Sequence, residues 1–161
     1  MFDPIILLAL LLAQGSDSGP QTASATLSLN IGSHARVAFA STTLMFPDAD
    51  PDLVPVITAV PQNIEITAKA RTPRNAQVSL TLQAADDLRS GVNTLPASLI
   101  RWAATGSGFV AGTLNRASAQ TVATWTGSGV RNGTQSFAFE NKWTHPPGTY
   151  SVTLVYTMST P

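Results

Sequence analysis

Apolar and polar residues alternate through most of the chain, most clearly near its C-terminal end. The even-numbered positions Tyr150, Val152, Leu154, Tyr156 and Met158 are apolar, whereas the positions between them are mostly Ser and Thr. A period of two is typical of a strand with one buried face. At about 3.3 Å per residue, residues 149–158 would extend about 33 Å. We predict that they form a long strand in the centre of a sheet.

The same period recurs between turn signals in the rest of the chain. Residues 63–71 and 76–84 alternate on either side of a Thr-Pro-Arg-Asn turn and predict a β-hairpin, and residues 121–126 and 133–140 predict a second one, with Asn132-Gly133 in its turn. Shorter strands are expected at residues 22–31, 37–39, 43–46, 99–104 and 109–114, and an irregular connection at 86–93.

This succession of strands and turns sets the expected fold class. No sustained helical period follows residue 15, so neither a helical bundle nor a parallel α/β sheet fits the pattern. We predict an all-β protein, an immunoglobulin-like antiparallel β-sandwich of about eight or nine strands.

The N-terminal residues follow a different pattern. Residues 5–13 are all apolar, a run too short for the roughly 20 residues of a membrane-spanning helix but suited to the core of a signal peptide. Small residues precede a possible cleavage point after Gly15, although residues 1–4 lack the usual Lys or Arg. We predict a signal peptide at 1–15 and a single domain at 16–161. The mature protein would be secreted or held at the cell surface, after transit through the periplasm, with no transmembrane span.

Composition narrows the classes of partner. Only 11% of the residues are charged, and nine basic residues balance nine acidic ones, so the chain lacks the positive charge that nucleic-acid binding requires. The chain contains no cysteine, which excludes disulfides, thiolate nucleophiles and cysteine-ligated zinc.

Residues suited to catalysis are scarce. His34 and His145 are the only histidines, and the sequence contains no Gly-x-Ser-x-Gly, His-Glu-x-x-His or glycine-rich phosphate-binding motif. His145 stands before two prolines, as a turn residue would, and His34 follows Gly-Ser at the start of a strand. We expect no enzymatic activity and no required cofactor.

One acidic loop is the candidate metal site. Asp48, Asp50 and Asp52 alternate in a turn, and carboxylates suit a hard cation such as Ca²⁺. The sixth position of the loop is Leu53 and the twelfth is Ala59, where an EF-hand requires Gly and Glu. The alternative is a solvated acidic turn shaped by its two prolines.

The tryptophans suggest an alternative function. Trp102 and Trp125 lie within strand patterns and should be buried, whereas Trp143 lies in a predicted loop and could face a ligand. Exposed indole rings stack on sugars, so a secreted carbohydrate-binding or adhesive module is the alternative to a structural role.

The C-terminal strand also carries a family resemblance. Residues 146–157 read Pro-Pro-Gly-Thr-Tyr-Ser-Val-Thr-Leu-Val-Tyr-Thr and resemble the closing strand of bacterial spore-coat-protein-U-like and related pilin-type β-sandwich domains. The early alternating strand and residues 66–84 agree in layout. The resemblance implies an exported structural subunit of a surface fibre, pilus or coat, associating with itself or with other surface subunits. It supplies no catalytic residues, and the disulfide often found near the N-terminus of such subunits is absent.

Polymerisation of such a domain has a simple physical route. If one sheet lacks a strand, an alternating segment of a neighbouring copy can fill the gap by β-augmentation. Residues 22–31 fit this description, with Leu27, Leu29 and Ile31 as the anchoring side chains. The same segment could instead be the first strand of its own sandwich, and alternation alone does not distinguish the two.

Overall fold

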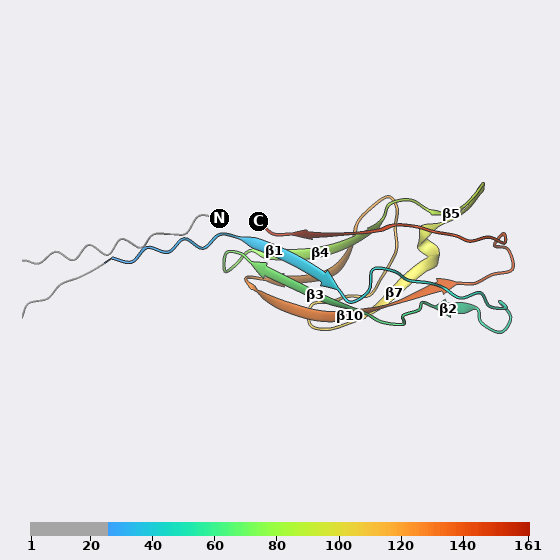
Figure 1. Ribbon diagram of the computed structural model, residues 1–161, viewed down its shortest axis with the longest axis horizontal. Coiled ribbons are helices and arrows are strands. Elements are labelled where there is room, and N and C mark those ends of the chain that lie inside the picture. Colours follow the sequence, from blue (N-terminus) through green and yellow to red (C-terminus); the bar gives the residue numbers. More distant parts are fainter. Residues whose placement is uncertain (1–25) are drawn as a thin grey trace, which may run out of the picture. The chain divides into compact units, whose positions relative to one another are not determined.

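The alternating segments of the sequence form antiparallel β-sheets that pack face to face (Figure 1). The computed structural model describes residues 26–161, and Ile31–Pro161 form one compact unit. The predicted signal peptide, residues 1–15, and residues 22–25 of the predicted first strand lie outside the described part. The all-β sandwich predicted from the sequence is confirmed.

The larger sheet contains six strands. Its order is β1-β3-β10-β7-β8, and β2 pairs with the end of β10. The long strand β10 crosses this sheet at its centre, between β3 and β7 (Figure 1). The strand bounds are β1 His34–Phe39, β2 Val56–Thr58, β3 Ile64–Arg71, β7 Ile100–Thr105, β8 Gly112–Thr113 and β10 Gly129–Glu140.

The second sheet contains three strands in the order β11-β4-β9, and two further strands form a small hairpin, β5-β6. A single-turn 3₁₀ helix, η1, precedes β7. Eleven strands are thus found in residues 26–161, more than the eight or nine expected, because several have only two or three residues. The remaining bounds are β4 Gln77–Ala84, β5 Leu88–Ser90, β6 Asn93–Leu95, η1 Ala97–Leu99, β9 Gln120–Thr126 and β11 Leu154–Ser159.

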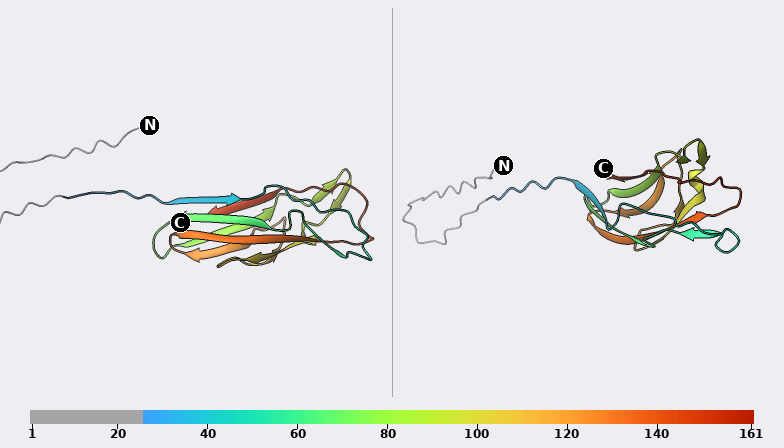
Figure 2. Two further views of the ribbon diagram at one scale, coloured as in Figure 1. Left: turned by 60° about the horizontal axis from the view of Figure 1, so that its bottom comes forward. Right: turned by 45° about the vertical axis from the view of Figure 1, so that its right-hand side comes forward.

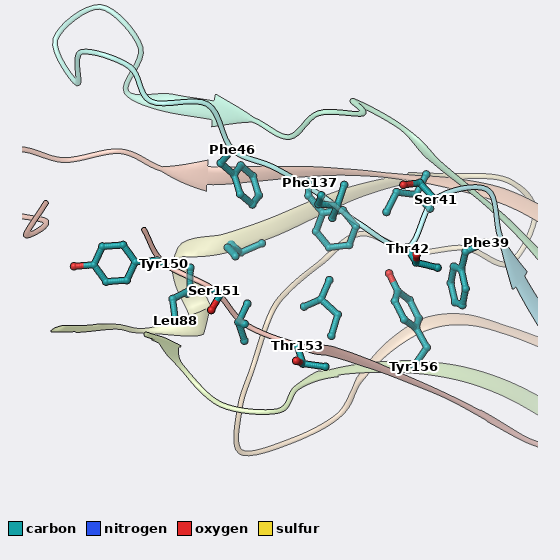
Figure 3. Close-up of a pocket in the computed structure, with 15 residues that line it drawn as sticks. Phe39, Ser41, Thr42, Phe46, Leu88, Phe137, Tyr150, Ser151, Thr153 and Tyr156 are labelled. Atoms are coloured by element: carbon teal, nitrogen blue, oxygen red, sulfur yellow. The ribbon is translucent and has the colours of Figure 1, made fainter. Parts of the chain in front are cut away.

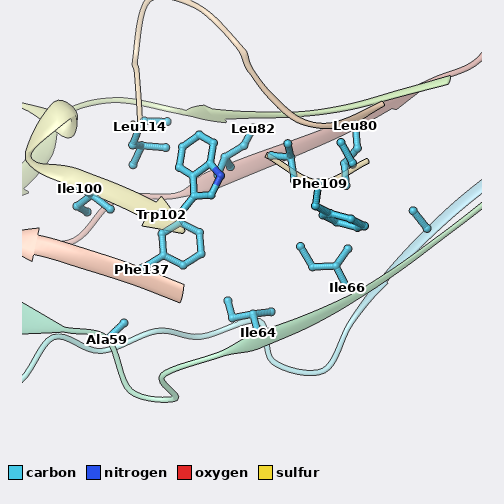
Figure 4. Close-up of a cluster of buried hydrophobic side chains, with 14 of the residues drawn as sticks. Ala59, Ile64, Ile66, Leu80, Leu82, Ile100, Trp102, Phe109, Leu114 and Phe137 are labelled. Carbon is cyan, nitrogen blue, oxygen red and sulfur yellow. The ribbon is translucent and has the colours of Figure 1, made fainter. Parts of the chain in front are cut away.

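The two main sheets face each other (Figure 2), and the hydrophobic core lies between them (Figure 4). Alternate residues of β3 and β4 are buried, as their sequence pattern predicts. Trp102 and Trp125 are also buried, as predicted, and the ring of Trp102 packs against that of Phe137 with centroids 6.2 Å apart. Each fully buried large apolar side chain contributes about 1.5–3 kcal/mol to stability. The fully buried large side chains include Ile66, Val78, Leu80, Leu82, Leu114, Val122 and Phe137.

Both predicted hairpins are wrong. β3 and β4 follow each other in the sequence, yet β3 belongs to the six-stranded sheet and β4 to the three-stranded sheet, and β9 and β10 are divided in the same way. The connections carry the chain from one sheet to the other, because the alternation fixes which face is buried but not which strand is the neighbour. The turn before β10 uses Gly127, at φ 76°, whereas Asn132 and Gly133 lie inside β10 and pair with β3.

The predicted long central strand is also corrected. β11 covers only Leu154–Ser159 and is an edge strand, since β4 is its one partner in the sheet. Ser151 makes only an isolated bridge to Arg89. The alternation identified the buried face, but it carries no information on whether the backbone edge of a strand is paired.

Three shorter segments also differ from expectation. Residues 86–93, predicted as an irregular connection, contain β5 and the start of β6. Residues 26–33 form no strand, and residues 43–46 contribute only an isolated bridge between Met45 and Val60. The first strand therefore begins at His34, later than the sequence pattern suggested.

Candidate functional site

An open groove lies between the edges of the two main sheets. β1 is the edge strand of one sheet and β11 of the other, and the rings of Phe39 and Tyr156 touch between them with centroids 4.5 Å apart. Beyond this contact, residues 41–46 and 150–154 border a cavity of about 450 Å³, with Ile64 and Phe137 among its lining residues (Figure 3). The groove therefore reaches toward the apolar core, although Ile64 and Phe137 themselves remain buried.

The backbone along β11 has unpaired groups on the groove side. The amide of Ala85 donates to the carbonyl of Thr153, so these two opposed residues are a hydrogen-bonded pair. In an antiparallel pair of strands every second residue is bonded in this way, so the backbone groups that point toward β4 are those of residues 153, 155 and 157. The backbone groups of Leu154, Tyr156 and Met158 point the other way, toward the free edge.

The facing edge of β1 has the same arrangement. The amide of Ala40 donates to the carbonyl of Glu65, so residues 34, 36 and 38 bond to β3. The backbone groups of Val37 and Phe39 are left toward the free edge, and both side chains pack against the core. The edges of β1 and β11 thus both have backbone groups without a partner strand, and the two strands touch only at Phe39 and Tyr156 in side-chain contact.

A buried polar pair lies beside this apolar groove. The hydroxyl of Tyr156 donates to Oε1 of Gln135 at 2.6 Å, and burial raises the pKa of the tyrosine hydroxyl well above its ordinary value. Gln135 is fully buried on β10, and its Nε2 has no hydrogen-bond partner within residues 26–161. The Tyr156 side chain therefore lines the groove and also satisfies the side-chain oxygen of the buried Gln135.

The predicted donor residues are exposed. The exposed fraction is 91% for Leu27, 79% for Leu29 and 61% for Ile31. Large apolar side chains are usually buried, and three of them at alternate positions form an apolar stripe that is available for a partner.

Trp143, the predicted ligand-facing residue, lies in the loop between β10 and β11. It is 69% exposed, and its indole Nε1 donates to Oδ1 of Asp52 at 3.0 Å. The indole ring is thus held in place by its polar atom while most of its surface contacts solvent. The structure places Trp143 next to the acidic loop, a proximity that the sequence did not predict.

The three aspartates of that loop do not gather into a metal site. In the described residues, no group of three or more His, Asp or Glu side chains is positioned to hold a metal ion. Oδ1 of Asp50 accepts a hydrogen bond from the backbone amide of Asp52 at 2.9 Å, and Asp52 itself accepts from Trp143. Asp48 lies in the same loop, at the border of a neighbouring cleft. The observed bonds are those of an acidic turn.

The two histidines lie on different elements. His34 opens β1 and is exposed, whereas His145 is half-buried in the loop before β11, with its ring 5.5 Å from that of Phe139. Within residues 26–161, neither imidazole has a hydrogen bond or an ion pair with a carboxylate. Nothing in this arrangement resembles a general base with its orienting acid.

The groove itself was missed in the sequence analysis. Its signal was the apolar spacing of Phe39, Leu44 and Phe46, which was assigned to short strands although residues 41–46 form the groove's border. A half-buried face on residues 150–154 was correctly identified but was taken as evidence of a central strand. Both patterns indicate apolar contact but do not show which strand edges are unpaired.

The fold is an all-β sandwich with a groove beside the edge strands of its two main sheets. No family model matches the sequence, and no curated protein matches it. In the described part of the chain, no helix has the length and apolar character needed to cross a bilayer.

Proposed function

We propose that this protein is an exported, non-enzymatic structural subunit of a bacterial surface fibre, pilus or coat, and that it assembles by strand donation. In this proposal, residues 22–31 of one copy lie in the groove of another, against residues 150–154 and the free edge of β11. The observation that carries it is the combination of an unfilled groove with an exposed alternating segment in the same chain.

The two surfaces are chemically matched. Side chains at alternate positions of an extended segment point to one side, so Leu27, Leu29 and Ile31 can enter the groove together. The groove's border and floor are mostly aromatic and aliphatic, and the backbone groups of Leu154 and Tyr156 lie along its edge. An inserted strand would thus gain apolar contacts and main-chain hydrogen bonds together, as in β-augmentation.

The apolar anchors supply a large part of the free energy of association. Burying one Leu or Ile side chain contributes about 1.5–3 kcal/mol, so three anchors contribute about 5–9 kcal/mol. Ordering the segment and losing the free motion of two separate copies oppose this gain, so the main-chain hydrogen bonds of the added strand must supply the remainder. Loss of one anchor should weaken association about tenfold or more, since 1.4 kcal/mol corresponds to a factor of ten.

Donation between copies is favoured over a β-hairpin in which residues 22–31 fold back onto β1 of the same chain. In a hairpin with a two-residue turn at Gly32-Ser33, opposed residues lie equally far from the turn. Leu29 would then lie opposite Arg36, and Leu27 opposite Ala38. Arg36 and Ala38 are on the exposed face of β1. The apolar stripe would then face solvent, whereas a strand from another copy is free to choose the register that buries it.

Export and a surface location are supported by the sequence. The apolar run at residues 5–13 has the length of a signal-peptide core, and the low charge content, with many Ser, Thr and Ala residues, is common outside the cell. The resemblance of residues 146–157 to pilin-type domains points the same way.

The test is the molecular mass of the protein in solution. Size-exclusion chromatography with light scattering should show oligomers whose mass rises with concentration. A variant with Leu27, Leu29 and Ile31 changed to Ser should remain monomeric and folded. The matched control changes Thr26, Ser28 and Asn30 to Ala, on the opposite face of the segment, and should still assemble. A concentration-independent monomer of the unaltered protein, or equal assembly of both variants, would contradict strand donation.

A further inference from the structure

A second hollow, the end cleft, lies between the loop at residues 44–51 and the loop at residues 141–150. Its volume is about 910 Å³, within the range of roughly 300–1,000 Å³ typical of ligand sites. The end cleft meets the groove at four residues that line both hollows, namely Leu44, Phe46, Leu88 and Tyr150. Trp143 and His145 line only the end cleft.

The two loops are held together by side-chain hydrogen bonds. Nδ2 of Asn141 donates to the carbonyl of Ala49 at 2.9 Å and to that of Val54 at 3.1 Å. Nε1 of Trp143 donates to Asp52 across the same gap. These contacts fix the borders of the end cleft before any ligand arrives, which lowers the ordering cost of binding.

The lining combines aromatic surface with polar groups of both kinds. The floor includes Phe46 and Phe139, whose ring centroids are 5.9 Å apart, and Trp143 offers an indole that is mostly exposed. Asp48 supplies carboxylate acceptors, and Lys142 supplies an ammonium donor.

The charges in the lining are mixed. Asp48 and Asp50 are opposed by Lys142, whose ammonium forms a 2.7 Å ion pair with Glu140. A strongly charged ligand of either sign would therefore meet like charge as well as opposite charge. Hydroxyl groups both donate and accept hydrogen bonds, so they suit a lining of this composition.

We propose that the end cleft binds a neutral carbohydrate. A pyranose ring stacks on the indole face of Trp143, and its hydroxyls bond to the carboxylate of Asp48 and to the ammonium of Lys142. Trp143 is suited to this role because its N–H is already satisfied by Asp52, which leaves the ring face as its remaining contact surface. The site does not depend on strand donation and would serve as a binding function in addition to assembly.

The test follows the indole N–H signals of the purified protein by NMR. The probes are glucose, galactose, mannose and N-acetylglucosamine, each alone and as a β-linked disaccharide. At least one should shift the Trp143 signal in a saturable way while the buried Trp102 and Trp125 signals stay in place. Trp143→Ala and Asp48→Asn should each weaken the affinity, measured by calorimetry, about tenfold or more. Leu53→Ala, an exposed change in the same loop but outside the lining, should leave it unchanged.

Three results would overturn the carbohydrate site. The first is that no probe shifts the Trp143 signal. The second is that sugar binding survives both cleft substitutions. The third is that a peptide of residues 22–31 shifts the Trp143 signal while the sugars do not. The last result would assign the end cleft to the assembly groove. Oligomer mass is measured on the same samples, and Trp143→Ala should leave it unchanged, so failure of the sugar site and failure of strand donation are distinguishable.

Discussion

At the scale of single residues, Gly133 shows how closely the core fits the backbone. A Cβ at this position would lie 2.5 Å from the ring of Phe109, which is itself buried. We expect Gly133→Ala to destabilise the protein by about 1–3 kcal/mol through overpacking, measured by urea unfolding. The control is Gly129→Ala, in the same strand, where the nearest atom is the end of the Arg131 side chain at 3.4 Å. Equal stability of the two variants would show that the Phe109 ring moves aside freely.

The Tyr156–Gln135 pair is a second test at this scale. Tyr156→Phe removes the one donor to Oε1 of Gln135 and leaves that buried amide unsatisfied, at a cost of about 1–3 kcal/mol in the free energy of unfolding. Adding Gln135→Leu should recover much of this loss, because both polar partners are then gone. Additive losses in the double variant would contradict the pairing.

The same pair predicts a dependence on pH. Burial raises the pKa of Tyr156 in the folded state, so the folded protein retains a proton that the unfolded chain releases above its ordinary pKa of 10.0. The stability linked to this group is complete below pH 10 and is lost as the pH rises further. The wild-type melting temperature should fall more steeply above pH 10 than that of Tyr156→Phe.

At the scale of elements, β11 combines a paired and an unpaired edge. In the monomeric variant with Ser at positions 27, 29 and 31, the amides of Val155 and Thr157 should exchange slowly because they face β4. The amides of Tyr156 and Met158 should exchange fast, and they should become protected in the assembled protein. Hydrogen exchange followed by NMR measures both states. Uniform protection along β11 in the monomer would contradict a free edge.

The elements also show what the sequence could predict. The alternation located β3, β4, β7, β9 and most of β10, because a half-buried strand must place apolar residues on one face. It did not identify their neighbours, since β3 and β4 have the same pattern in different sheets. The groove was not predicted for the same reason, because the sequence pattern does not show that β1 and β11 each have a strand on one side only. Trp143 was singled out, but its contact with Asp52 depends on how two distant loops meet.

At the scale of the whole molecule, we propose that a segment of one copy completes the sandwich of another. The proposal joins the groove beside β11 with the exposed side chains of Leu27, Leu29 and Ile31. Sugar binding at the end cleft is a separate property, and the assembly proposal stands without it.

The most direct test is disulfide trapping between copies, which is clean because the chain contains no cysteine. One variant carries Val152→Cys in the groove, and the others carry a single Cys at position 27, 28, 29, 30 or 31. Each donor variant is mixed with the groove variant and oxidised, and cross-linked heterodimers are quantified. Strand donation predicts the highest yield at an odd-numbered position, with little product at 28 and 30. Absence of heterodimers, or equal yields at all five positions, would contradict strand donation.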